Sequence, residues 1–244
     1  MTAWLTRYRP VDDARLRLLC LPFAGGTDAA YRAWPDALPA DVEVCGVCLP
    51  GRDARRREPP HARMTTLVPA LADGLAAELE RPFALFGHSM GAGVAFGLAR
   101  ELRRRGRPAP ALLIVSGRRA PQLPEPDPWH ALPTDALVAR LRRLGGTPDV
   151  VLREPELMAM FLPVIRADLA VIEAEPYREE PPLELPIVAL GGESDDRCSR
   201  AELEAWRAQT TSAFTSTIFP GSHFFVTSAA RQVLAQIAAA LASA

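Results

Sequence analysis

The sequence predicts an α/β protein with a mostly parallel central sheet and helices on both faces. Short apolar runs alternate with longer helical patterns along the chain, as expected for repeated strand–helix–strand units. Hydrophobic residues make up 48% and charged residues 23%, as in an ordinary globular domain. The 244 residues are enough to bury a core without disulfides or metals. We therefore expect residues 1–244 to form a single domain.

The predicted elements follow from the spacing of the apolar residues. Short apolar runs predict strands over Leu16–Leu21, Val42–Leu49, Phe83–Phe86, Leu112–Ser116, Ile187–Leu190 and Phe214–Phe219. Helical patterns predict helices over Ala29–Leu38, Met64–Leu79, Met90–Arg105, Ala201–Ala208 and Thr227–Leu241. The order along the chain is mostly strand, helix, strand, so right-handed crossovers should join neighbouring parallel strands.

One segment, residues 120–182, interrupts this alternation. Pro-rich loops open and close it, and between them lie two helical patterns, at about Thr134–Leu144 and Pro155–Glu175, without a strand. Pro163 should kink or split the second helix, because proline removes a helical hydrogen bond. That helix also has too many apolar residues for one face. We therefore predict a helical insertion over the sheet edge, with an extra helical layer in the core as the alternative.

Charge and composition argue against several classes of protein. The 28 basic and 29 acidic residues leave a net charge of −1, without the basic excess of a nucleic-acid binder. No run of about 18 apolar residues could span a membrane, and the polar first residues do not resemble a signal peptide. We expect a cytoplasmic protein that binds neither nucleic acid nor a membrane.

The cysteines include one C-x-x-C pair, Cys45 and Cys48. The pair lies in a predicted strand, where residues three apart point to opposite faces. No second pair or nearby histidine completes a zinc site. We therefore expect buried, reduced thiols and neither a metal nor another cofactor.

The most specific motif is Gly87-His88-Ser89-Met90-Gly91, a G-x-S-x-G between an apolar strand and an Ala/Gly-rich helix. A tight strand-to-helix turn lifts the serine hydroxyl above the carboxyl end of the sheet, and the helix N-terminus faces a developing oxyanion. Ser89 is therefore the predicted nucleophile; a serine in an ordinary glycine turn is the alternative.

A serine hydroxyl is a weak nucleophile and needs a base. His223 follows the last predicted strand, so it should lie at the same sheet edge as Ser89. The side chain of His88 should point away from its neighbour Ser89. His61 lies in a polar loop and His130 in the insertion, so His223 is the predicted base.

The base in turn needs an acid that fixes its tautomer. In enzymes whose nucleophilic serine lies on such a strand-to-helix turn (a nucleophile elbow), the acid commonly follows a late strand and precedes the histidine. Asp195 and Asp196 are both placed in this way, and Glu193 is a weaker candidate. Because adjacent loop residues point in different directions, only one aspartate should reach the histidine; the other fits a helix-capping role.

The oxyanion needs two backbone donors. The N–H of Met90, directly after the nucleophile, is the first. The second should come from Phe23 or Ala24, in a loop after an early strand whose glycines allow close approach of backbone. An ordinary glycine turn is the alternative.

Taken together, these motifs resemble the type II thioesterases, the discrete editing enzymes of polyketide and nonribosomal-peptide assembly lines. The resemblance runs nearly end to end, with every motif in the family order. It rests on CLPFAGG (Cys20–Gly26), LPGRDARRREPP (Leu49–Pro60), FGHSMG (Phe86–Gly91), LRRLGGTP (Leu141–Pro148), PELMAMFLPVIRADL with Tyr177, GGESDD (Gly191–Asp196) and FPGSHFF (Phe219–Phe225).

The resemblance implies an α/β-hydrolase fold in which residues 120–182 form a helical lid over an acyl chamber. It carries the nucleophile onto Ser89, the base onto His223 and the oxyanion donors onto Met90 and Phe23 or Ala24. The family's acid loop usually reads G-x-x-D-P; aligned on Gly192, it selects Asp195, while Asp196 replaces the usual proline and stays the second choice.

The implied activity is removal of aberrant or stalled acyl groups from the phosphopantetheine arm of an acyl or peptidyl carrier protein, through an acyl-serine. Alternatives are a carboxylesterase or acyltransferase of the same fold and an inactive binding protein. Acidic carrier proteins would dock on a basic rim. The residues that we expect there are Arg52, Arg55 and Arg118, with a solvated surface as the alternative.

The acyl pocket is also predicted to contain adaptable lid side chains. The candidates are Met158, Met160 and Phe161, with packing inside the lid as the alternative. We expect the protein to be a monomer.

Overall fold

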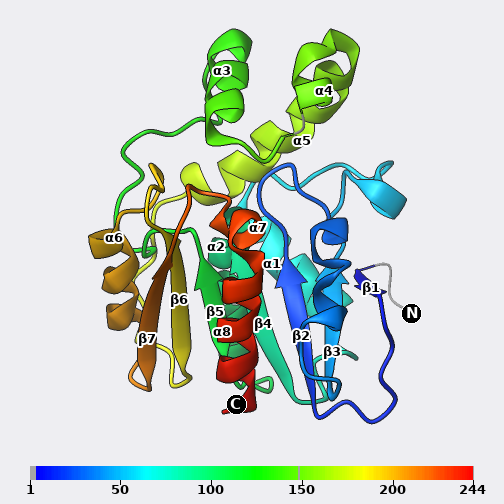
Figure 1. Cartoon of the computed structure of the whole chain (residues 1–244), viewed down its shortest axis with the longest axis vertical. Helices are drawn as coiled ribbons and strands as arrows, with labels where there is room; N and C mark the ends of the chain where they lie inside the picture. The colour runs from blue at the N-terminus through cyan, green and yellow to red at the C-terminus, as the bar shows by residue number, and fades with distance from the viewer. Residues whose placement is uncertain (1–3, 148, 244) are drawn as a thin grey trace.

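A seven-stranded sheet runs through the middle of the molecule, in the order β1-β3-β2-β4-β5-β6-β7 (Figure 1). The computed structural model describes residues 4–147 and 149–243. β1 pairs antiparallel with β3, and the other neighbouring strands pair in parallel. This confirms the predicted α/β class with a mostly parallel sheet.

The strands are close to those predicted from the apolar runs. They are β1 (Leu5–Arg7), β2 (Leu16–Leu21), β3 (Val42–Val47), β4 (Phe83–His88), β5 (Leu113–Ser116), β6 (Ile187–Gly192) and β7 (Phe214–Phe219). The predicted strands differ from these only at their ends. β1 was not predicted, because it has only three residues and is only half-buried.

The helices differ more from the prediction. They are α1 (Met64–Gly74), α2 (Met90–Arg104), α3 (Thr134–Leu144), α4 (Asp149–Arg153), α5 (Pro155–Glu173), α6 (Arg200–Glu204), α7 (Phe225–Ser228) and α8 (Ala230–Ala242). The helix predicted over Ala29–Leu38 is instead two 3₁₀ turns, because Pro35 has no N–H for a longer α-helix. Pro163 does not split α5, which continues through it.

Each face of the sheet has its own buried core, as alternation along the strands requires. Leu19 and Leu21 of β2 point to one face, where they join the side chains of α1 and α2. Leu18 and Cys20 point to the other face and pack with α8. In Figure 1, α8 lies in front of the sheet, and α1 and α2 lie behind it. Helices therefore cover both faces, as predicted.

The insertion of residues 120–182 contains α3, α4 and α5. In Figure 1, α3 and α4 project beyond the end of the sheet toward which β2 points. Their buried side chains form a separate cluster with Trp129 and with Ile165 and Leu169 of α5. Because Ala24 also packs against this cluster, the insertion contacts the loop that follows β2.

All four cysteines are free and buried. Burial raises the pKa of the Cys45 and Cys198 thiols to about 12, so these thiols are protonated and weakly reactive. Among the described residues, none of the helices combines the length and apolar character needed to cross a bilayer.

Candidate active site

Ser89 lies at the sharp turn between β4 and α2. Its backbone angles are φ 54° and ψ −115°, a conformation that a residue with a side chain rarely adopts. Its N–H donates a hydrogen bond to the carbonyl of Ser116, at the end of β5, over 2.7 Å. Strain of this kind persists only where the surrounding structure enforces it, and it is concentrated at functional sites.

Two glycines make this turn possible. A Cβ atom on Gly87 would lie 2.1 Å from the carbonyl oxygen of Gly91, and one on Gly91 would lie 2.2 Å from that of Leu21. Both distances are far below van der Waals contact. The first turn of α2 therefore packs directly on the backbone of β4 and on the end of β2, and no larger residue fits at either glycine.

His223 and Asp195 form a buried pair at the same edge of the sheet. The Nδ1 atom of His223 lies 3.0 Å from both carboxylate oxygens of Asp195. The side chains are 3% and 0% exposed. Asp195 also accepts a hydrogen bond from the N–H of Arg197, over 2.8 Å. Asp196 is exposed, so of the two aspartates, the structure places Asp195 against the histidine.

A cavity of about 40 Å³ brings the predicted groups together. Ser89, His223, Phe23 and Ala24 all line it. Met90 is the first residue of α2, and the first N–H groups of a helix have no partner within it. The loop after β2 is held by a hydrogen bond from the N–H of Gly26 to the carbonyl of Phe23, over 2.8 Å. Ser89 thus directly precedes α2 and shares the cavity with the loop after β2, the two segments predicted to carry the oxyanion donors.

The cavity wall contains three charged groups, of which the sequence analysis selected only Arg118, as a docking residue. Glu173, Arg197 and Arg118 line it, together with Trp129. The side chain of Glu173 is fully buried, and its Oε1 atom has no hydrogen-bond partner. These residues are separated along the chain, so no local motif indicated them. Only the position of Arg118 directly after a strand gave a signal.

His88 lies beside the buried pair of His223 and Asp195. Its ring centroid is 5.1 Å from that of His223, and its Nδ1 atom lies 3.0 Å from the hydroxyl of Ser116. Burial, and next the nearby His223, hold the pKa of His88 well below its usual value. The folded protein therefore keeps the His88 imidazole neutral beside His223.

The arginines predicted to dock a carrier are not presented as a basic rim. Arg52 is buried and forms an ion pair with Asp168, over 2.6 Å. Arg55 is buried too, with its guanidinium 3.6 Å from the centre of the Trp4 ring. Arg118 is half-buried, and its Nη2 atom donates to the carbonyl of Ile172. These guanidinium groups bond mainly to groups inside the protein, and the unpartnered Nε of Arg52 is itself buried, so they do not present a donor fork to a partner's carboxylates.

The lid residues predicted to line the acyl pocket do not reach Ser89 in this structure. Met158 is buried in the lid's own cluster. Met160 and Phe161 are 71% and 43% exposed. None of the three is among the residues that line the cavity beside Ser89, which agrees better with the alternative of packing within the lid for Met158.

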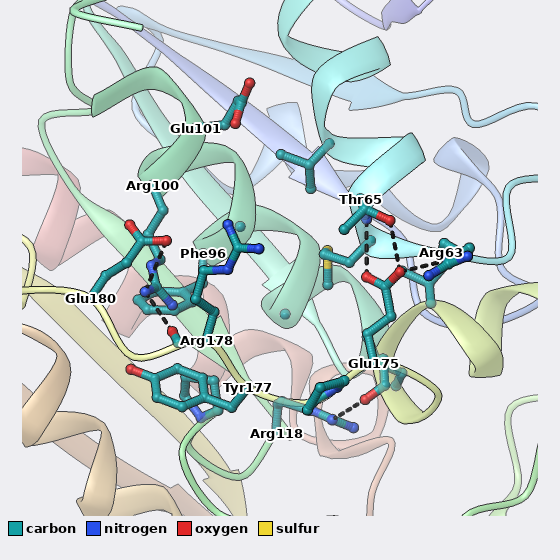
Figure 2. Close-up of a pocket in the computed structure, with 18 of the residues that line it drawn as sticks. Arg63, Thr65, Phe96, Arg100, Glu101, Arg118, Glu175, Tyr177, Arg178 and Glu180 are labelled. Atoms are coloured by element: carbon teal, nitrogen blue, oxygen red, sulfur yellow. Dashed lines mark hydrogen bonds and ion pairs between the residues drawn. The ribbon is translucent and has the colours of Figure 1, made fainter. Parts of the chain in front are cut away.

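A larger cavity, of about 720 Å³, lies along α2 and the segment that follows α5. Figure 2 shows Phe96 and Tyr177 in its lining, and the ion pairs of Arg63 with Glu175 and of Arg100 with Glu180. Arg118 and Ile172 line both this cavity and the one beside Ser89. The two cavities are therefore neighbours that share a wall.

Among the described residues, Asp28, Cys48 and Asp53 offer ligand atoms within 4.8 Å of one another. Burial, and next a hydrogen bond to Asp28, raise the pKa of Asp53. A protonated Asp53 can donate to Asp28, so a hydrogen bond accounts for the close approach of the two carboxyl groups. The group lies outside the cavity of Ser89, and we assign it no metal.

The elbow serine after β4 and the histidine after β7, on a mostly parallel sheet, define an α/β-hydrolase. The model of the family described as "Thioesterase domain" matches residues 16–241. The chain belongs to this thioesterase family and, by its relatives, is a type II thioesterase, a hydrolase of thioesters.

The relatives match over nearly the whole chain. The gramicidin S biosynthesis protein GrsT of Aneurinibacillus migulanus is 40% identical over 224 residues, which are 91% of this chain and 88% of GrsT. The structure of RedJ, a thioesterase from the prodiginine biosynthetic pathway in Streptomyces coelicolor, has a TM-score of 0.88 and 40% identity, covering 95% of this chain and 91% of RedJ. That of BorB, a type II thioesterase from the borrelidin biosynthetic cluster, has a TM-score of 0.87 and 39% identity, covering 96% of each chain.

The lowered pKa of His88 predicts a loss of stability in acid. Below about pH 6.5 the unfolded chain binds a proton at His88 that the folded protein does not, so the free energy of unfolding falls as the pH falls. In His88→Gln, the decrease between pH 7.5 and 5.5 should be smaller by about 1 kcal/mol. Urea unfolding of both proteins at the two pH values measures it; equal decreases would contradict a neutral, buried His88.

Proposed function

We propose that this thioesterase removes acyl groups from the phosphopantetheine arm of an acyl or peptidyl carrier protein, through an acyl-serine on Ser89. One observation carries the proposal: the strained Ser89 shares a small cavity with His223, whose Nδ1 is held by the buried Asp195. The names of the relatives agree with a role in a biosynthetic pathway, since GrsT and RedJ are proteins of gramicidin S and prodiginine biosynthesis.

The geometry supports a division of roles among these groups. With Nδ1–H donated to Asp195, the Nε2 atom of His223 is the one left to accept the proton of Ser89. The serine oxygen then attacks the thioester carbonyl. Backbone N–H groups of Met90 and of Phe23 or Ala24 stabilise the oxyanion. His223 gives its proton to the leaving pantetheine sulfur, and the acyl group stays on Ser89.

Hydrolysis of the acyl-serine uses the same groups, with water in the place of the pantetheine thiol. His223 takes a proton from water, and the resulting hydroxide attacks the acyl carbonyl. The tetrahedral intermediate collapses, Ser89 recovers its proton from His223, and the free acid leaves. Removal of a wrong or stalled acyl group in this way would free the carrier arm for the assembly line, which is the editing role that we propose.

Ser89→Ala should abolish release of acetate from an acetylated, phosphopantetheinylated carrier protein. Members of such a catalytic unit each contribute several orders of magnitude to the rate, and we expect a loss of at least about 10³-fold. Intact-mass spectrometry of the carrier measures the reaction, with the urea midpoint as a check that the variant folds.

A matched oxygen ester of the same acyl group is the second substrate. Cleavage of the ester with an untouched carrier would contradict the carrier-directed function and favour a general esterase. Turnover of the carrier by Ser89→Ala within tenfold of the unaltered protein would contradict the role of Ser89.

The two adjacent aspartates should differ sharply when each is replaced by asparagine. Asp195→Asn removes the carboxylate that holds the His223 tautomer, and a change of this kind lowers kcat by about 10⁴-fold in the best-studied serine enzymes. Asp196→Asn, at an exposed neighbour, should change kcat less than about threefold. Steady-state kinetics on the acetylated carrier measures both; a larger loss in Asp196→Asn would reverse the assignment.

Acyl groups of two or three carbons should be the best substrates. The cavity beside Ser89 has about 40 Å³, whereas roughly 10–15 Å³ holds one water-sized group. Longer chains normally gain about 0.8 kcal/mol for each CH₂ that they bury, but this cavity has no room for that gain. We expect kcat/KM to fall at least about tenfold from acetyl to decanoyl on the same carrier. An increase with chain length would contradict the prediction.

A further inference from the structure

A buried ion pair connects the lid to the loop after β3. Asp168 lies on α5 and is 2% exposed; Arg52 follows β3 and is 7% exposed. The Nη2 atom of Arg52 donates to Oδ1 of Asp168 over 2.6 Å, and Nη1 donates to Oδ2 over 2.8 Å. This two-pronged contact fixes both the distance and the plane of the carboxylate.

The same pair binds the backbone of the loop after β2. The N–H of Gly25 donates to Oδ2 of Asp168 over 2.8 Å. Arg52 donates through Nη1 to the carbonyl of Gly26 over 2.9 Å. These two backbone groups directly follow Phe23 and Ala24, which line the cavity beside Ser89. Asp168 and Arg52 together thus hold the loop at two consecutive residues, Gly25 and Gly26.

Packing connects α5 to this loop in two further places. Gly25 has a φ of +72°, and a Cβ there would lie 2.6 Å from Cγ1 of Ile165, one turn before Asp168 on α5. Ala24 packs against the lid cluster that contains Ile165. α5 therefore contacts the loop after β2 directly, through the hydrogen bond from Gly25 to Asp168 and through apolar packing, and indirectly through Arg52.

Stability alone is a weak reason for such a pair. Burial raises the pKa of Asp168 against the opposing effect of Arg52, so desolvation of the carboxylate is unfavourable here. Well-packed apolar residues are often as stabilising as a buried ion pair, or more so. Apolar side chains, however, cannot accept the Gly25 N–H or donate to the Gly26 carbonyl. What the pair specifically provides is the orientation of this loop's backbone.

We propose that Asp168 and Arg52 are positioning residues that hold the second oxyanion donor, and that docking of α5 on the core is required for that donor to be in place. The inference rests on the proposed role of Phe23 or Ala24 in oxyanion stabilisation. Oxyanion donors act at 2.7–3.1 Å from the charged oxygen, and a displacement of about 1 Å lowers the rate about 10²-fold. Movement of α5 away from the core would take Asp168 with it and release Gly25.

A graded pair of substitutions tests this. Asp168→Asn keeps one oxygen that can accept the Gly25 N–H but loses the two-pronged contact with Arg52, whereas Asp168→Ala loses both. We expect kcat to fall about tenfold in Asp168→Asn and about 10²-fold in Asp168→Ala, with KM for the acetylated carrier within about threefold. Arg52→Lys, which keeps the charge without the planar fork, should resemble Asp168→Asn.

The chain offers a matched control in a second buried ion pair. Arg17 and Glu43 are 6% and 1% exposed and lie 2.8 Å apart, at the opposite end of β2 and β3 from the loops that carry the site. Glu43→Ala should lower the urea midpoint as Asp168→Ala does, but leave kcat of the folded protein unchanged. A loss of kcat in Asp168→Ala no greater than in Glu43→Ala would overturn the proposal.

The carbonyl stretching frequency of an acyl-enzyme reports on the hydrogen bonds donated to that carbonyl. It would not change if Asp168 only stabilised the fold. Ser89 is acetylated with p-nitrophenyl [1-¹³C]acetate at low pH, where deacylation is slow, and the band is recorded by difference infrared spectroscopy. Weaker donation to the carbonyl should shift the band to higher frequency in Asp168→Ala, with an intermediate shift in Asp168→Asn and none in Glu43→Ala. An unshifted band in Asp168→Ala would overturn the proposal.

These measurements also separate the proposal from the proposed function. The activated ester needs no carrier, so acetylation and the infrared band remain measurable even if carrier-bound thioesters prove not to be substrates. In that outcome the carrier-directed function fails while the positioning role is still supported or overturned by the band. If the Ser89→Ala variant is acetylated as readily as the unaltered protein, both the proposed function and the positioning role are overturned.

Discussion

The close contact of α2 with the strands beneath it is the constraint on which the rest of the site depends. The backbone of Gly87 and that of Gly91 approach so closely that neither position has room for a side chain, and this contact forces Ser89 into its strained turn. The Ser89 N–H in turn bonds to Ser116 at the end of β5. Gly117, with a φ of +60°, follows there, close to the rings of both His88 and His223. One tight packing contact thus fixes positions at several strand ends.

The parallel sheet explains why residues so distant in the sequence meet. Parallel strands end at the same edge, so the loops after β2, β4, β6 and β7 gather there, and each brings one part of the site. The histidine itself is nearly inaccessible to water, with its side chain 3% exposed, and the half-buried Phe224 packs edge-on against it, with centroids 5.3 Å apart. In such surroundings the charge of Asp195 acts on the imidazole with little screening.

The strands β2 to β7 and the turn at Ser89 could be predicted from the sequence, because each depends on a local pattern. The position after a late strand left Asp195 and Asp196 open, and only the family resemblance selected Asp195; in the structure, it is Asp195 that is buried against His223. The Arg52–Asp168 contact spans 116 positions and has no local signature, and arginine is exposed by default. Arg52 was accordingly assigned to the surface, although its guanidinium is an internal cross-link between a core loop and the lid.

The contact between Arg52 and Asp168 relates the size of the acyl group to the stabilisation of the oxyanion. With α5 docked, the cavity beside Ser89 is small, and Leu169 of the same helix helps to line it, one residue after Asp168. An acyl group too large for the cavity that displaces Leu169 would push α5 outward. On the proposed positioning role, the same movement pulls Asp168 from the Gly25 N–H and misplaces the oxyanion donor. Discrimination against large acyl groups would then be expressed mainly in kcat, because the enzyme would still bind the carrier but lose the donor that the transition state needs.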